Sequence, residues 1–135
     1  MKRSPALRQL SREHHTALGL ALRIARAADP EAKNALLATA LTLFADELEP
    51  HFLEEERQLL PQLAKAGEAA LVARTLDEHA QLRALAAAIG EGDTEALALF
   101  GKRLQTHVHF EEHELFNVAE RRLFAIPGTL VSGDS

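Results

Sequence analysis

Apolar residues recur every three or four positions along most of the chain, which is the spacing that places them on one face of an α-helix. Prolines and glycines divide this pattern into four stretches. Ser4-Pro5 and Asp29-Pro30 each pair a typical N-cap residue with a proline suited to the first helical position. Gly67 is placed to end the second stretch, and a loop at 90–93 precedes the fourth. The pattern therefore predicts helices over about 5–28, 30–66, 68–89 and 94–124.

Four helices joined by short connections predict one all-α domain, an antiparallel up-down-up-down four-helix bundle. Abundant Ala and Leu and scarce Val and Ile favour helix over sheet. We assign the bundle to residues 1–125 and expect 126–135 to be a flexible C-terminal tail. Pro50 lies inside the second predicted helix, where its missing N–H donor predicts a kink.

Polar residues interrupt the apolar faces of all four predicted helices. At about 100° of rotation per residue, one histidine of each helix falls on the face that also carries leucines such as Leu18 and Leu76. These inward histidines are His14, His51, His79 and His107. Glu55 and Glu111 fall on the same faces, each four residues after an inward histidine. The remaining histidines, His15, His109 and His113, are expected to face water.

Two inward glutamates need a compensating positive charge, because an ionised carboxylate buried without partners is very costly. A metal ion supplies that charge, and imidazole with carboxylate suits iron, manganese or zinc. The alternative to a metal for the histidines is that they are ordinary core residues with hydrogen bonds. For the glutamates, the alternative is an ion pair with arginine. The neighbouring Glu54, Glu56 and Glu112 are expected to be solvated. Glu13 and Glu78 either orient an imidazole or lie at the surface.

Composition narrows the function classes further. The chain has no cysteine, which excludes disulfides, thiol catalysis and iron–sulfur clusters. Its net charge is −5 and its Lys and Arg are dispersed, so we expect no nucleic-acid partner. No apolar run is long enough to cross a bilayer, and no secretory signal is visible. We therefore expect a cytoplasmic protein without a membrane partner, either a monomer or a weak homodimer.

The second and fourth predicted helices repeat one motif, H-x-x-x-E-E-x-x-L, in HFLEEERQL and HVHFEEHEL. The first and third each carry an adjacent Glu-His pair, in LSREHHTALGLALR and LDEHAQLRAL. In order and spacing these four blocks resemble the hemerythrin-like, or HHE cation-binding, family. The resemblance covers Leu10 to about Arg122. It implies an antiparallel four-helix bundle that holds a non-haem di-iron centre.

The resemblance also implies a role for each inward side chain. His14 and His51 would bind one iron, His79 and His107 the other, and Glu55 and Glu111 would bridge the two irons, with an oxo or hydroxo bridge between them. The oxygen-carrying relatives have a fifth histidine where this chain has Arg83. Without this histidine, one iron would lose a protein ligand, and a coordination position would open for solvent or substrate. That departure weighs against plain reversible oxygen carriage. Arg83 could also reach out to water, or His15 or Glu112 could replace the lost ligand.

These implications lead to three functional hypotheses. In the first, the protein binds dioxygen or a related small diatomic ligand for sensing, storage or delivery. In the second, it is a di-iron redox enzyme that acts on peroxide or nitric oxide. In the third, it stores iron, or holds a structural Zn²⁺ or Mn²⁺.

Overall fold

The computed structural model describes residues 3–124, which are helical throughout apart from the connections and contain no strand. The predicted all-α class is therefore confirmed for this part of the chain. The first helical segment is α1 (Pro5–Arg26) and the third is α5 (Ala69–Gly90). The second comprises α2 (Pro30–Leu43), η1 (Phe44–Leu48), α3 (Glu49–Glu54), η2 (Glu55–Leu59) and α4 (Leu60–Lys65). The fourth comprises α6 (Thr94–Phe110), η3 (Glu111–Leu115) and α7 (Phe116–Leu123). The predicted tail, 126–135, lies outside the described residues.

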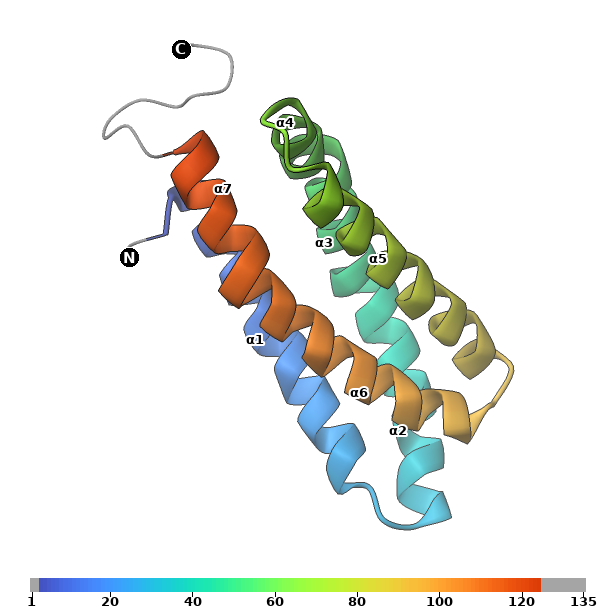
Figure 1. Ribbon diagram of the computed structural model, residues 1–135. Helices are drawn as coiled ribbons and strands as arrows, with labels where there is room; N and C mark the ends of the chain where they lie inside the picture. Colours follow the sequence, from blue (N-terminus) through green and yellow to red (C-terminus); the bar gives the residue numbers. More distant parts are fainter. Residues whose placement is uncertain (1–2, 125–135) are drawn as a thin grey trace.

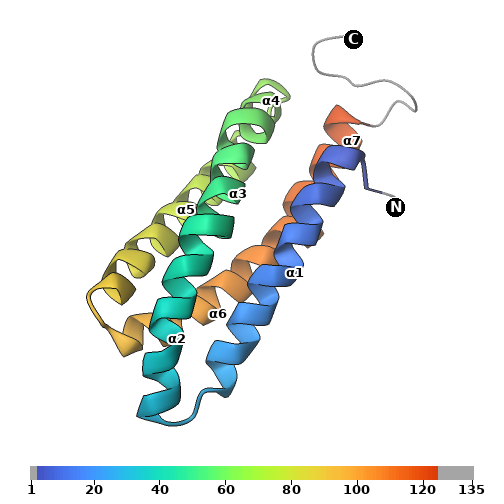
Figure 2. The same cartoon turned by 180° about the vertical axis from the view of Figure 1, so that it is seen from behind.

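The four segments lie side by side (Figure 1). The main contacts join α1 to α6, α5 to α6, and α2 to both α5 and α6. The connections after α1 and before α6 lie at one end of the bundle, and the connection after α4 lies at the other (Figures 1 and 2). The helices are thus consistent with a four-helix bundle.

Helix ends follow most of the signals in the sequence. The Asp29 carboxylate accepts a hydrogen bond from Ala32 N–H at 2.7 Å, and the Asp93 carboxylate caps α6 in the same way. Gly67 has a φ of +92°, as expected of a residue that ends a helix. Ser4 is different, because its side chain makes no cap. Instead its backbone N–H donates to buried Glu120 of the fourth segment at 2.8 Å.

The second and fourth segments contain wide turns of the π type, in which the backbone N–H reaches five residues back. Two of these turns, η2 and η3, begin at Glu55 and Glu111, the two inward glutamates. The third, η1, directly precedes the short helix that contains Pro50. The kink expected at Pro50 stays a prediction, but the turn that precedes this residue does depart from the regular α-helical hydrogen-bond pattern.

Two apolar clusters fill the interior. One is centred on Phe52, Phe100 and Leu104, and the other on Leu7, Phe110 and Phe116. Along α1, residues 17–24 contribute to the first cluster and residues 7–10 to the second, with His14 between them. The inward polar residues thus occupy a layer between two apolar layers.

Two leucines placed on the apolar face by sequence are exposed: Leu18 by 37% and Leu76 by 44%. Ala17 and Thr75 are buried at those levels instead, and the Thr75 hydroxyl donates to the Leu71 carbonyl at 2.8 Å. Small residues therefore occupy the inward positions at these two levels of the bundle. Among the described residues, no helix combines the length and the apolar character that a membrane crossing requires.

We expect Gly101→Val to destabilise the fold by about 1–3 kcal/mol, because overpacking displaces neighbouring groups. A Cβ atom at Gly101 in α6 would lie 3.0 Å from Ile24 Cγ2 in α1. Gly19→Val is the matched control, since nothing lies within 4 Å of the corresponding Cβ position. Its effect should stay within about 0.5 kcal/mol. Urea unfolding measures both, and equal losses would contradict the close packing of α1 against α6.

Candidate metal centre

All six side chains that the sequence placed inward converge in the polar layer between the apolar clusters. None is more than 4% exposed, and Glu55, His79 and Glu111 are fully buried. One histidine comes from each of α1, α3, α5 and α6, and the two glutamates begin η2 and η3. The structure therefore brings every predicted site residue together.

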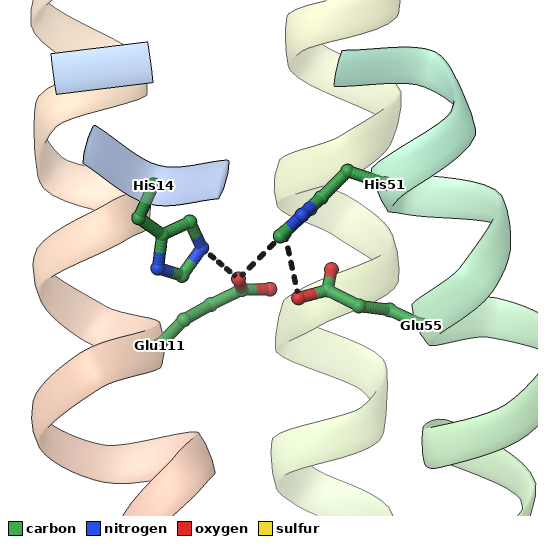
Figure 3. A group of neighbouring side chains, drawn as sticks. All are labelled: His14, His51, Glu55 and Glu111. Carbon is green, nitrogen blue, oxygen red and sulfur yellow. Dashed lines mark hydrogen bonds and ion pairs between the residues drawn. The ribbon is translucent and has the colours of Figure 1, made fainter. Parts of the chain in front are cut away.

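The six side chains form two overlapping groups in which potential metal-ligand atoms all lie within 4.8 Å of one another. The first group contains His14, His51, Glu55 and Glu111, and is drawn in Figure 3. The second contains Glu55, His79, His107 and Glu111. Both glutamates belong to both groups, so two neighbouring cations could share the two carboxylates.

The Nε2 atoms of the histidines point at these shared carboxylates. His14 Nε2 lies 2.8 Å from Glu111 Oε1, and His79 Nε2 lies 2.9 Å from Glu55 Oε1, both in hydrogen-bonding geometry. His51 Nε2 lies 3.1 Å from the other Glu55 oxygen. His107 Nε2 lies 3.0 Å from the other Glu111 oxygen.

The last two contacts lack hydrogen-bonding geometry, so their four atoms are buried without a hydrogen-bond partner. These atoms are His51 Nε2, Glu55 Oε2, His107 Nε2 and Glu111 Oε2. Buried polar atoms in native proteins nearly always have a partner. Imidazole nitrogens and carboxylate oxygens that converge without one are the donor set that iron, manganese or zinc takes. The residues present therefore fit a metal, and a purely hydrogen-bonded histidine core fits them less well.

The opposite nitrogen of each ring, Nδ1, faces a glutamate from another helical segment. His14 pairs with Glu112 at 2.6 Å; at 2.7 Å each, His51 pairs with Glu13, His79 with Glu56, and His107 with Glu78. A carboxylate at Nδ1 holds the proton there and leaves Nε2 free for a metal. Each segment thus supplies one inward histidine and one glutamate that orients the histidine of a neighbouring segment.

This arrangement corrects two expectations. Glu56 and Glu112 are not simply solvated, because both are partly buried and orient His79 and His14. For Glu13 and Glu78, the orienting role is the one observed. All four lie directly beside an inward residue in the sequence, but so does Glu54, so this position alone could not have identified them. Glu54, by contrast, is exposed as expected, as are His15, His109 and His113.

The structure also shows where Arg83 goes. Its guanidinium donates to Glu49 at 2.8 and 3.1 Å and to Glu56 at 2.8 and 3.2 Å, and forms no hydrogen bond with any of the six inward side chains. The other proposed substitutes for the missing histidine do not reach the centre either. His15 is exposed, and Glu112 faces the outer nitrogen of His14.

A surface pocket of about 490 Å³ adjoins one side of the centre. Its wall includes His14 and Glu112, and Arg3, His15, Leu18 and His113 lie around it. The pocket therefore brings solvent-accessible space next to one of the oriented histidines.

The buried charges change the protonation of the metal-free centre. Burial lowers the pKa of His51, but Glu55 and Glu111 outweigh burial and raise this pKa to about 11. The same balance raises the pKa of His79 to about 9 and that of His107 to about 10. Burial raises the pKa of Glu111, but His107, His14 and His51 hold it well below its usual range. Without metal, protonated imidazoles thus supply the positive charge that the buried carboxylates need.

Comparison with known proteins gives one match. The model of one protein family, described as the hemerythrin HHE cation binding domain, matches residues 6–119. No curated protein and no solved structure matches the chain. The family match covers all six inward residues and the four glutamates that orient the histidines.

We expect the metal-free protein to lose stability as the pH rises. A histidine whose pKa is higher in the folded state stabilises the fold fully below its unfolded pKa of about 6.5. That contribution disappears as the pH rises through the folded values of about 9 to 11. Thermal unfolding in the presence of a chelator, measured from pH 6 to 10, checks this.

The metal-loaded protein is the control, and its stability should change in the opposite direction over pH 5–7. Protons compete with metal for the imidazoles, so the metal and its stabilisation are lost as the pH falls. A metal-free protein whose melting temperature is flat between pH 6 and 10 would contradict the assigned charges.

Proposed function

The chain belongs to the hemerythrin HHE cation-binding domain family, and from this premise we propose that it holds a non-haem di-iron centre. His14 and His51 would bind one iron, and His79 and His107 the other. Glu55 and Glu111 would bridge the two irons. The observation that carries the proposal is the pair of overlapping donor groups that share two buried carboxylates.

The proposal includes the antiparallel up-down-up-down order of the four segments. The connections at alternating ends of the bundle in Figure 1 support it. This order would place an orienting glutamate from one neighbour beside each inward histidine.

We propose that the centre binds dioxygen or a related small diatomic ligand. When bound, a di-iron centre supplies reversible, redox-linked binding of such a ligand. The chain's own residues orient the metal ligands and exclude water. Phe52 stacks on His79 with ring centroids 4.1 Å apart, and Phe116 stacks on His14 at 5.4 Å. The pocket beside His14 offers a route for a small ligand.

Binding without turnover would suit sensing, storage or delivery of the ligand. The protein would then act as a monomer or as a weak homodimer. Neither nucleic acid nor a membrane is needed for this role.

A second candidate is a di-iron redox enzyme that acts on peroxide or nitric oxide. The position of Arg83 favours it, because the guanidinium is tied to Glu49 and Glu56 and donates no ligand. Each metal position then has two histidines and two shared carboxylates. Few protein ligands and open positions are typical of reactive non-haem iron sites. The remaining alternatives are iron storage and a structural Zn²⁺ or Mn²⁺ site. Metal analysis after purification without added metal separates them, because two irons per chain favour the first two functions and one zinc favours a structural site.

We expect His14→Ala, His79→Ala and Glu55→Ala each to lower the metal bound per chain sharply. Each removes a donor from one or both groups, and the melting temperature should fall as well. Mass spectrometry of metals after reconstitution with ferrous salt provides the measurement. His109→Ala, an exposed histidine on the same segment as His107, is the control and should retain two metals. Full metal content in all three site variants would refute the assignment.

We expect the reduced, iron-loaded protein to change its visible spectrum when exposed to dioxygen, and to recover when oxygen is removed. The reason is that oxygen would bind at the buried centre between the two apolar clusters, where little water is present and irreversible oxidation of the iron is slow. The enzyme alternative predicts a steady rate of peroxide or nitric oxide consumption, lost in Glu111→Ala and above that of free iron. Absence of both behaviours in protein with two irons would leave neither function standing.

A further inference from the structure

The four glutamates that orient the histidines differ in what else they bind. Glu56 Oε2 accepts the Nδ1 proton of His79 at 2.7 Å and also a guanidinium N–H of Arg83 at 2.8 Å. The second Arg83 nitrogen reaches Glu56 Oε1 at 3.2 Å. A full positive charge therefore bonds to the same oxygen that orients the histidine.

The other three orienting carboxylates do not share an oxygen in this way. Arg74 donates to Glu78 Oε2, whereas His107 faces Oε1. Arg3 reaches Glu112 Oε1 at 3.5 Å, whereas His14 and the neutral Ser11 hydroxyl meet at Oε2. Glu13 accepts from the neutral amide of Gln9.

Arg83 is held in place from several sides. Glu49 binds it through two nitrogens, at 2.8 and 3.1 Å. Its guanidinium also lies 5.5 Å from the ring centre of Phe52, the ring that stacks on His79. The planar guanidinium loses little side-chain entropy for each hydrogen bond that it forms. Two carboxylates can therefore hold its charge in place beside Glu56 at low cost.

A carboxylate at Nδ1 increases the electron donation of the imidazole to a metal. A charge-assisted hydrogen bond from arginine to the same oxygen draws electron density back. Arg83 therefore reduces the effect of Glu56 on the imidazole of His79. At His14, the corresponding oxygen of Glu112 accepts, apart from the ring proton, only from the neutral Ser11 hydroxyl.

We propose that Arg83 is a positioning residue that works through Glu56 to weaken electron donation by His79, so that the two metal positions are electronically unequal. The proposal rests on the proposed two-metal centre and extends it. The ligands at the His79–His107 position donate less electron density, so the iron bound there is the easier one to reduce.

The test compares Arg83→Gln, which keeps a hydrogen-bond donor but removes the charge, with Arg83→Lys, which keeps the charge. In zinc-loaded protein labelled with ¹⁵N-histidine, the His79 Nδ1–H proton should shift downfield in Arg83→Gln. A more basic Glu56 would strengthen that hydrogen bond. Arg83→Lys should stay near the unaltered protein. In iron-loaded protein, Arg83→Gln should lower the reduction potential of one iron.

Arg74→Gln is the matched control, since it removes an arginine from the far oxygen of Glu78. Its effect on the His107 Nδ1–H proton should be smaller. Equal shifts in both variants, no shift in Arg83→Gln, or an upfield shift with a raised potential would each overturn the proposal. The number of zinc ions bound per chain separates these outcomes from failure of the proposed two-metal centre. A protein that does not bind two zinc ions contradicts the two-metal centre itself, and not the role of Arg83.

Discussion

The charge of two buried glutamates is the constraint to which the rest of this structure responds. Glu55 and Glu111 are fully buried between two apolar clusters, where an ionised carboxylate is costly unless positive charge lies against it. Four imidazoles face them, and they can supply that charge in two ways, as protonated rings or as ligands of metal cations. The metal-free and metal-loaded proteins thus meet the same requirement by different means. This is why pH, metal binding and stability are coupled at one point of the fold.

A second layer of interactions makes the centre a property of the whole bundle. Each inward histidine is oriented by a glutamate from another segment, so no helix forms its part of the site alone. The wide turns η2 and η3 begin at the two shared glutamates, where the helix departs from its regular hydrogen-bond pattern. Such turns are frequent at functional sites.

The two groups of potential ligands share Glu55 and Glu111 but differ in their surroundings. His14 borders a surface pocket, whereas His79 is fully buried against Phe52 and is linked through Glu56 to Arg83. One donor group thus adjoins an open pocket, and the other lies next to the fixed charge of Arg83. A family whose members share one metal-binding frame can vary its chemistry through such surroundings.

The sequence by itself determined the helices, the six converging side chains and much of the inward faces. Helical periodicity and end signals carry this information locally, and two histidine–glutamate pairs spaced four residues apart repeat it. Only the tertiary structure decided the roles of Glu56, Glu112 and Arg83, because each acts on a side chain of another segment. It also decided that Leu18 and Leu76 are exposed, because Ala17 and Thr75 occupy the buried positions at those levels. Periodicity gives the direction of a side chain from its own helix, and the distance to the neighbouring helices comes only from packing.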